Sequence, residues 1–415
     1  MRLSGVILGL VLCAAVASAA DDPIDQLDDL LTFGSSDGRI RGRISGTLEL
    51  EGYVFPQPAP ALIDSSGDAL FNPRFTTFLD LQLGSWVYAF AQARADRGFD
   101  PGDESPRARL DEYAIRFSPS HDGAMNLQIG KFATVVGNWI ARHGAWDNPF
   151  VSAPLPYEEL TGMWDQVAVR SATILRGWAH VAPPALAGVP AADKYLRLPV
   201  IWGPSYTTGV AISGRLGRIT YAAEVKNAAL ASRPESWRAD DKQWRHPTVS
   251  GRIGFVPNPM WNLGVSASDG VYLQPRARPT IAPGLSFGDF RQTVFGQDLS
   301  FAWHHLQLWA EVYEARFAIP RVGNADTFSY YIEAKYKFTP QWFGAVRWNE
   351  QLYGRISNGA AGSVRWGSDV WRADVASGYR FTPHLQLKVQ YSLQHEEDGP
   401  RDFVHILSAQ LSLRF

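Results

Sequence analysis

The last nine residues, Leu407-Ser-Ala-Gln-Leu-Ser-Leu-Arg-Phe415, decide the fold of this chain. Apolar and polar residues alternate along the whole stretch, and the apolar set is Leu407, Ala409, Leu411, Leu413 and Phe415. Because successive side chains of a β-strand point to opposite faces, this alternation predicts a strand with one apolar face and one polar face. Such a strand fits an antiparallel sheet that borders an apolar environment on one side and water on the other.

The same period of two residues dominates the chain from about Arg43 onward, most clearly in segments 44–54, 306–312 and 385–394. Short turns, such as Gly84-Ser85 and Thr382-Pro383-His384, alternate with long polar loops. The long loops are 55–73, 97–106, 136–205, 228–246, 270–291, 317–328, 352–369 and 395–403. Seven short turns and eight long loops connect about sixteen strands, a layout typical of an all-β, transmembrane, antiparallel up-and-down barrel.

The composition excludes several other classes of protein. The chain has 415 residues, of which 46% are apolar and 19% are charged, and its formal net charge is −2. A charge this close to zero excludes electrostatic affinity for nucleic acid as the main function. The apolar share excludes wholesale disorder. The high counts of Trp (15) and Gly (37) favour short strands and turns over a helical core.

Aromatic residues gather within a residue or two of the short turns and of the C-terminus. They are Trp86, Phe117, Phe255, Trp261, Phe301, Trp303, Phe338, Trp342, Phe381 and Phe415. Trp and Tyr favour the boundary between membrane and water, so this distribution predicts an aromatic girdle at one rim. The alternative, a soluble β-sandwich core, does not explain why these rings gather at one rim.

The N-terminus has the features of an export signal. Arg2 supplies the positive charge, Val6 to Val16 is apolar, and Ala17-Ser18-Ala19 fits the cleavage pattern. The apolar stretch is short for a transmembrane anchor, which is the alternative. We therefore expect a signal peptide at 1–19, a short periplasmic segment at 20–40 and a transmembrane barrel at 41–415.

Two segments resemble a known family. The stretch Leu110-Asp-Glu-Tyr-Ala-Ile-Arg-Phe-Ser-Pro119, followed by Leu127-Gln-Ile-Gly-Lys-Phe132, is similar to the phosphate-selective porin O/P-like group of Gram-negative outer-membrane porins. The strand that ends at Phe415 resembles the signal read by the barrel-assembly machinery. The resemblance implies a channel in the outer membrane, a homotrimer, and contact with outer-membrane lipids and lipopolysaccharide. Phosphate selectivity does not carry over, because loop 136–205 lacks a dense cluster of Arg and Lys.

The third long loop, 136–205, is too long for a plain surface connection and is rich in Trp, Tyr and Pro. In porins the third loop folds into the lumen and narrows it, and we expect the same here. The alternative is that residues 167–178 form an extra hairpin, which would make eighteen strands. A barrel of either size is too wide for side chains to fill, so it holds water.

Strand parity assigns charged side chains of both signs to the lumen, where water keeps their cost low. We expect loop acids Asp147, Glu158, Glu159 and Asp165 to face Arg347, Arg372 and Lys388 at a constriction, with Arg94, Arg252 and Glu311 also lining the pore. For any single charge, an ion pair between strands is an equal alternative to a role in selectivity. Alternation places Lys131 on the apolar side, so it either snorkels to the rim or is turned inward by a bulge.

These features predict a porin for passive diffusion of small hydrophilic solutes or ions, without enzymatic activity, cofactor or metal. A carbohydrate- or anion-selective channel is the first alternative, because the loop aromatics are suited to stacking on sugar rings. A barrel hydrolase is less favoured, since the motif His-Glu-x-x-His is absent and the histidines show no constellation of a base with a nucleophile. The loop histidines, which are His143, His304, His305 and His395, are expected to be ordinary polar loop residues.

Overall fold

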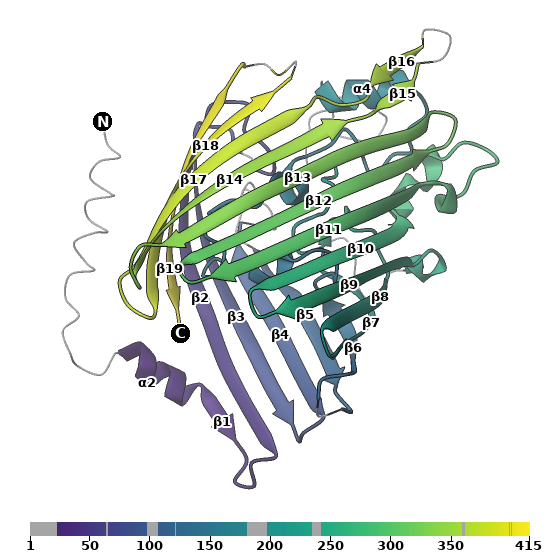
Figure 1. Ribbon diagram of the computed structural model, residues 1–415. Coiled ribbons are helices and arrows are strands. Elements are labelled where there is room, and N and C mark those ends of the chain that lie inside the picture. Colours follow the sequence, from purple (N-terminus) through teal and green to yellow (C-terminus); the bar gives the residue numbers. More distant parts are fainter. Residues whose placement is uncertain are drawn as a thin grey trace.

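The chain folds into a closed β-barrel (Figure 1). The computed structural model describes residues 23–63, 65–97, 107–120, 122–180, 197–234, 242–358, 362–397, 399 and 401–415. The sheet holds 17 strands, of which β2 to β14 and β17 to β19 form the 16-stranded barrel and β1 adds to its edge. All neighbouring strands pair antiparallel, and β19 pairs back to β2. The predicted up-and-down barrel of about sixteen strands is confirmed.

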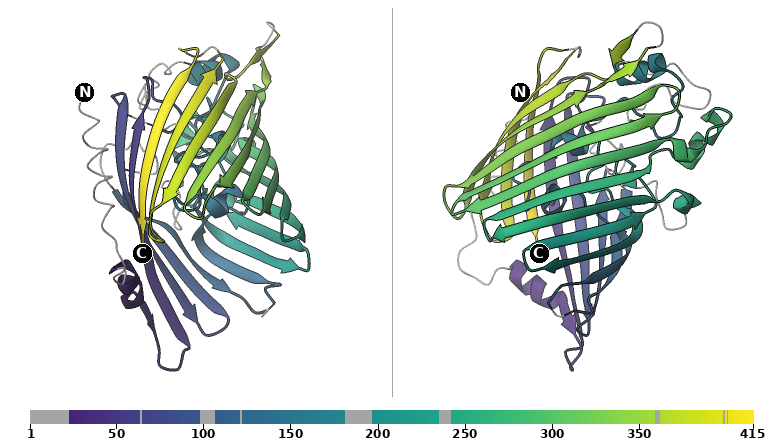
Figure 2. Two further views of the ribbon diagram at one scale, coloured as in Figure 1. Left: turned by 60° about the vertical axis from the view of Figure 1, so that its left-hand side comes forward. Right: turned by 45° about the vertical axis from the view of Figure 1, so that its right-hand side comes forward.

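The barrel strands are β2 (Ile40–Val54), β3 (Ala69–Leu83), β4 (Val87–Asp96), β5 (Arg107–Phe117), β6 (Asn126–Phe132), β7 (Thr207–Leu216), β8 (Ile219–Lys226), β9 (Thr248–Asn258), β10 (Trp261–Val271), β11 (Arg291–Trp303), β12 (Leu306–Ile319), β13 (Gly323–Lys337), β14 (Trp342–Tyr353), β17 (Val370–Arg380), β18 (Leu385–Glu396) and β19 (Val404–Arg414). Short turns join them at one end of the barrel and long loops at the other (Figure 2). A small hairpin, β15 (Arg355–Ser357) and β16 (Ser363–Arg365), lies in one long loop.

The strands carry their polar side chains inside and their apolar side chains outside. In β18, Val389 and Tyr391 are 45% and 44% exposed, whereas Lys388 and Gln390 between and beside them are buried. The pattern repeats in β13 and β14, where Ile332 and Val346 are exposed. The barrel is therefore inverted relative to a soluble protein, which explains the strict alternation in the sequence.

The seam between β19 and β2 depends on a glycine. Phe415 exchanges two backbone hydrogen bonds of 3.0 Å with Gly46. Its ring covers this glycine so closely that a Cβ at position 46 would lie 2.5 Å from a ring carbon. Beyond this point β2 continues without β19, and the short strand β1 (Thr32–Gly34) pairs with Arg41–Arg43 instead.

A short helix, α2 (Pro23–Leu30), precedes β1 and is tied to the short-turn end of the barrel. Asp28 accepts two hydrogen bonds of 2.9 Å from Arg43, and Asp25 lies 2.9 Å from the ring nitrogen Nε2 of His384. The expected signal peptide, 1–19, lies outside the described residues.

Aromatic rings pair with one another beside the short turns. The pairs are Trp86 with Phe117, Trp261 with Phe301, and Phe338 with Trp342, at centroid distances of 6.1, 4.5 and 4.4 Å. Trp86, Phe338 and Trp342 are also widely exposed on the outer surface. These rings form a band at the rim where the sequence predicts a girdle.

The segment between β6 and β7, residues 133–206, is called loop 3 below. Its described part contains the short helices η2 (Trp139–Arg142), α3 (Leu155–Glu158) and α4 (Ala172–His180). Residues 172–178 are helical, so the alternative of an extra hairpin at 167–178 is wrong. A short apolar run fits a buried helix as well as a strand, and here Leu175 and Trp178 are buried. Within the described ranges, no helix has the length and apolar composition needed to cross a membrane.

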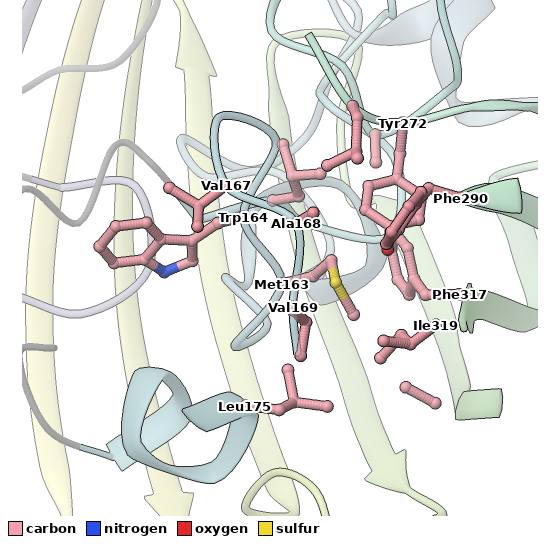
Figure 3. Close-up of a cluster of buried hydrophobic side chains, with 14 of the residues drawn as sticks. Met163, Trp164, Val167, Ala168, Val169, Leu175, Tyr272, Phe290, Phe317 and Ile319 are labelled. Atoms are coloured by element: carbon pink, nitrogen blue, oxygen red, sulfur yellow. The ribbon is translucent and has the colours of Figure 1, made fainter. Parts of the chain in front are cut away.

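Loop 3 packs into a dry hydrophobic core inside one side of the barrel (Figure 3). Met163, Trp164 and Leu175 of loop 3 meet Tyr272 and Phe290 at the two ends of the long loop between β10 and β11. That loop also contains η6 (Pro275–Thr280) and η7 (Phe287–Asp289), and η5 (Lys242–Arg245) lies in the preceding long loop. The C-terminal end of β12 contributes Phe317 and Ile319 to the same core. Loop 3 is thus folded into the lumen, as the sequence predicts.

Candidate functional site

Acidic side chains on the barrel wall hold the first part of loop 3. Glu311 on β12 accepts hydrogen bonds from the backbone N–H groups of Asn138 and Trp139 and from the hydroxyl of Tyr157. Glu224 on β8 accepts a hydrogen bond of 2.5 Å from the Thr134 hydroxyl. Each of these carboxylates is buried and accepts hydrogen bonds from loop 3. Glu311 therefore positions loop 3.

Lys388 on β18 holds the next part of the loop. Its ammonium donates to the backbone carbonyls of Ala145, Asn148 and Phe150 at 2.7, 2.9 and 3.0 Å. The side chain is completely buried. An ammonium has three protons, and all three have a partner in this arrangement.

Two arginines continue this row of contacts. Arg347 on β14 donates to Asp374 at 2.8 Å and to the Ser152 hydroxyl at 2.9 Å. Arg372 on β17 donates to Glu158 and, at 2.5 Å, to the carbonyl of Ala153. Both guanidinium groups are buried beneath loop 3. The three predicted cations, Arg347, Arg372 and Lys388, thus contact the part of loop 3 that carries the predicted acids. A role for them in ion selectivity stays a prediction.

The four acids predicted for the constriction lie in different environments. Asp147 is exposed, Glu158 pairs with Arg372, and Glu159 is buried beside α3. Asp165 is buried in the dry core, where the side-chain amide of Gln274 donates to it. Burial raises the pKa of the Asp165 carboxyl to about 6. The structure therefore does not bring these acids together.

A cavity in the lumen lies between loop 3 and the part of the wall formed by β2 to β4 and β17 to β19. This cavity of about 150 Å³ is bordered by Glu51, Arg74 and Arg94 of the wall and by Tyr157 and Glu158 of loop 3. It is called the passage below. The dry core packs against the ends of β10 to β14, on another side of the barrel, so this cavity lies off-centre.

Three arginines on adjacent strands form a row on the inner face of the barrel, and the first two, on β3 and β4, border the passage. Arg74, Arg94 and Arg109, on β3, β4 and β5, have side chains that are 19%, 12% and 15% exposed. Their partners are the carboxylates Glu49, Glu51, Asp96 and Asp111, which are buried behind them. The guanidinium groups are therefore more exposed to the lumen than the carboxylates paired with them, although Glu51 also borders the cavity. The paired acids fix the orientation of the guanidinium groups.

Sequence reasoning finds Arg94 but misses Arg74 and Arg109. Arg74 directly follows the predicted end of the loop at 55–73, where strand parity has no fixed origin. Its place on the inner face of β3, between Asn72 and Thr76, follows only from the register with β2. Arg252, also predicted for the lumen, pairs with Asp298 at 2.6 Å on another side of the barrel.

Cations without a carboxylate partner gather at the short-turn end of the lumen. The ring of Trp146 in loop 3 lies 5.1 Å from the guanidinium of Arg380 and 4.1 Å from that of Arg414. Lys335 lies nearby, over Phe343, and interacts electrostatically with Arg380. None of these three cations forms a salt bridge within the described part of the chain, although Asp147 is close enough to attract Arg414.

The histidines make structural contacts. His143 in loop 3 is buried, which lowers its pKa, so the ring is neutral. Its Nδ1 donates to the Ile140 carbonyl at 2.6 Å, and its Nε2 accepts from the Tyr206 hydroxyl at 2.8 Å. His395 contacts the carbonyl of Asp402 at 2.5 Å. In the residues that the structure describes, no group of three or more His, Cys, Asp or Glu is placed to hold a metal ion.

Lys131 follows the alternation of its strand without a register shift, as the sequence predicts. It pairs with Tyr113, yet it is buried and its ammonium lies 3.5 Å from the carbonyl of Leu110. The register between β4 and β5 shifts at Gln92/Ala93, so the bulge lies in β5, beside Leu110, and not in the strand of Lys131.

Comparisons with known proteins identify the fold. No family model and no curated protein matches the chain. OmpT, an outer membrane protein of Vibrio cholerae, aligns with a TM-score of 0.56 at 8% identity over 92% of this chain and 99% of its own. An anion-selective porin from Comamonas acidovorans gives 0.54 at 9% identity over 91% and 100%. Salmonella typhi OmpF, in complex with daunomycin, gives 0.54 at 11% identity over 92% and 100%. Another OmpT structure is described as a trimer form. At these identities the likeness is one of fold, and the fold is that of a porin.

Proposed function

We propose that this chain is an outer-membrane porin of a Gram-negative bacterium, through which small hydrophilic solutes or ions diffuse passively. The observation that carries the proposal is the row of partly exposed arginines along an off-centre passage in a barrel whose outer surface is apolar. An apolar band on the outside suits lipid, and a charged inner face suits water. Outer-membrane proteins and porins with this fold support the same location.

The contacts of loop 3 explain how such a channel keeps a fixed width. Buried groups from β8, β12, β14, β17 and β18 bind successive parts of the loop, including Glu224, Glu311, Arg347, Arg372 and Lys388. A loop held at this many points has little freedom to move into the passage. Solute size is then limited by the passage and not by the diameter of the barrel.

The test is conductance of the refolded protein in planar bilayers, together with swelling of proteoliposomes in sugars of graded size. We expect stepwise currents in KCl and a sharp size limit for swelling. The variant Arg94→Gln should lower the anion-to-cation permeability ratio severalfold, because it removes a positive lumen charge and leaves Asp96 and Asp111 with one cation fewer each. The matched control is Arg218→Gln, an exposed arginine in a short turn. A protein that folds but neither conducts nor swells liposomes would contradict the proposal.

An anion-selective channel is the second candidate. Lys335, Arg380 and Arg414 supply positive charge at the short-turn end of the lumen with no salt-bridged acid in the described chain. Such a group raises the local concentration of anions. Reversal potentials in a KCl gradient distinguish the candidates, and Arg380→Gln should shift them toward cation selectivity. Selection of sugars is less supported, because Trp139 and Trp202 beside the passage are buried.

Membership of the phosphate-selective O/P-like group remains part of this proposal, as does a homotrimer, which the trimer form of OmpT supports. We also propose contacts with lipids, lipopolysaccharide and the barrel-assembly machinery, the last through Phe415. Analytical ultracentrifugation in detergent would test the trimer.

A further inference from the structure

One side of the passage is apolar. The loop between β2 and β3, residues 55–68, contributes Pro60, Ala61, Leu62 and Ile63 to its border. It is called loop 1 below. Ile63 packs against a buried cluster on the wall that includes Tyr53 and Ile406. Leu62 packs against the dry core of loop 3. Loop 1 thus spans the distance from the wall to loop 3 and presents aliphatic side chains to the passage.

The facing side is charged. The guanidinium of Arg74 is held by Glu49 and Glu51 at 3.3 Å and by Asp96 at 3.2 Å, and that of Arg94 by Asp111 at 2.8 Å. These acids are buried, whereas both arginines are partly exposed. Arg372 also borders the passage, next to Glu158. A solute at this point therefore meets the guanidinium N–H donors of Arg74 and Arg94, which lie beside carboxylates such as Glu51, on one side and hydrocarbon on the other.

The free energy of a solute in the passage depends on which chemical groups it presents to these two sides. A carboxylate gains charge-assisted hydrogen bonds from the arginines. A hydrocarbon chain or ring loses unfavourable contact with water when it touches loop 1. A polyhydroxylated solute loses hydrogen bonds to water when it contacts Leu62 and Ile63, and these aliphatic side chains cannot replace them. The passage of about 150 Å³ has room for about five water molecules, which suits a small organic molecule.

We propose that the passage selects small organic anions in which a carboxylate is joined to an apolar chain or ring. Loop 1 supplies the side that recognises the apolar part, through Leu62 and Ile63, and the arginine row supplies the side that recognises the carboxylate. The inference rests on the proposed porin function and names its preferred solutes.

The experiment compares two ions that differ in polarity but share charge and carbon number. Hexanoate and gluconate are both six-carbon monocarboxylates, and gluconate carries hydroxyl groups along its chain. Reversal potentials with sodium hexanoate on one side of a bilayer and sodium gluconate on the other give their permeability ratio. In the double variant Leu62→Asn/Ile63→Asn the preference for hexanoate should fall by about fourfold for each methylene group that loses apolar contact.

The matched control is Ile281→Asn. Ile281 is also a half-buried isoleucine in a long loop, but it does not border the passage. Its permeability ratio should equal that of the wild type. Heat-modifiable migration on SDS gels verifies that each variant folds. A second variant, Arg94→Gln, should lower the permeability of both anions by a similar factor and leave their ratio nearly unchanged.

The outcomes separate the two proposals. If the double variant conducts KCl but keeps the wild-type ratio, or if Ile281→Asn changes the ratio equally, the inference about solutes is overturned and the porin function stands. If the folded wild-type protein conducts no ions, the porin function fails and the inference fails with it. A fall in the ratio confined to the double variant supports the inference.

Discussion

Replacing Lys388 with methionine should free part of loop 3 without unfolding the barrel. Methionine keeps the length of the apolar stem and removes the ammonium that binds the carbonyls of Ala145, Asn148 and Phe150. Each hydrogen bond to a charged group contributes about 1.5–3 kcal/mol, and losing one partner of a buried charged contact costs about 3–5 kcal/mol. Because the groups left without a partner are neutral carbonyls and not charges, we take the lower figure, about 3 kcal/mol. Since 1.4 kcal/mol is a factor of ten, local opening of the loop should become about 100-fold more frequent.

Hydrogen exchange and single-channel recording measure this effect together. Amides in segment 145–153 should lose protection, while those of the barrel strands keep it, because strand pairing is untouched. Channel currents should become larger and noisier. Lys337→Met is the matched control, since Lys337 is an exposed lysine at the end of β13. If Lys388→Met matches the wild type in both exchange and current noise, the claim that this ammonium anchors loop 3 is refuted.

Three further predictions follow from the same contacts. Gly46→Leu should lower the unfolding temperature of the barrel, because its side chain would displace the Phe415 ring, 2.5 Å from the added Cβ; retained heat resistance on gels would contradict this. The buried carboxyl of Asp165, with its pKa raised from 3.8 to about 6, holds its proton in the folded loop at pH values where an unfolded loop has released it. Packing of the loop 3 core should therefore be most stable below about pH 4 and lose about 3 kcal/mol as the pH rises through 6. Asp165→Asn should abolish this dependence in pH-resolved hydrogen exchange. Arg347→Ala and Arg372→Ala should each change single-channel conductance by loosening loop 3, and unchanged conductance and ion selectivity in both would rule out a role for these arginines at the constriction.

The sequence predicts the barrel well because the relevant signal is local. Alternation in segments such as 385–394 fixes which side chains face out, and Val389 and Lys388 lie on the expected sides. Turn chemistry fixes where strands end. Strand number follows from these two features without any long-range information. The extra hairpin at 167–178 is wrong because a short apolar run does not distinguish a buried helix from a strand.

The site is harder to predict because it depends on the path of loop 3. Parity places Arg347, Arg372 and Lys388 on the inner face, but it cannot tell whether an inner side chain meets water or a packed loop. The structure finds all three beneath the loop. The arginines that do face water include Arg74 and Arg109, whose strands begin beside long loops where parity is ambiguous.

The short strand β1 has a consequence for the chain's behaviour among its neighbours. β2 extends past the end of β19, so the backbone groups of residues 41–43 would otherwise form an open strand edge. Such an edge is a template on which another polypeptide can add a strand and begin to aggregate. By pairing with those residues, β1 reduces the open edge at this point to its own three residues, and an edge strand this short is a poor template for a second chain.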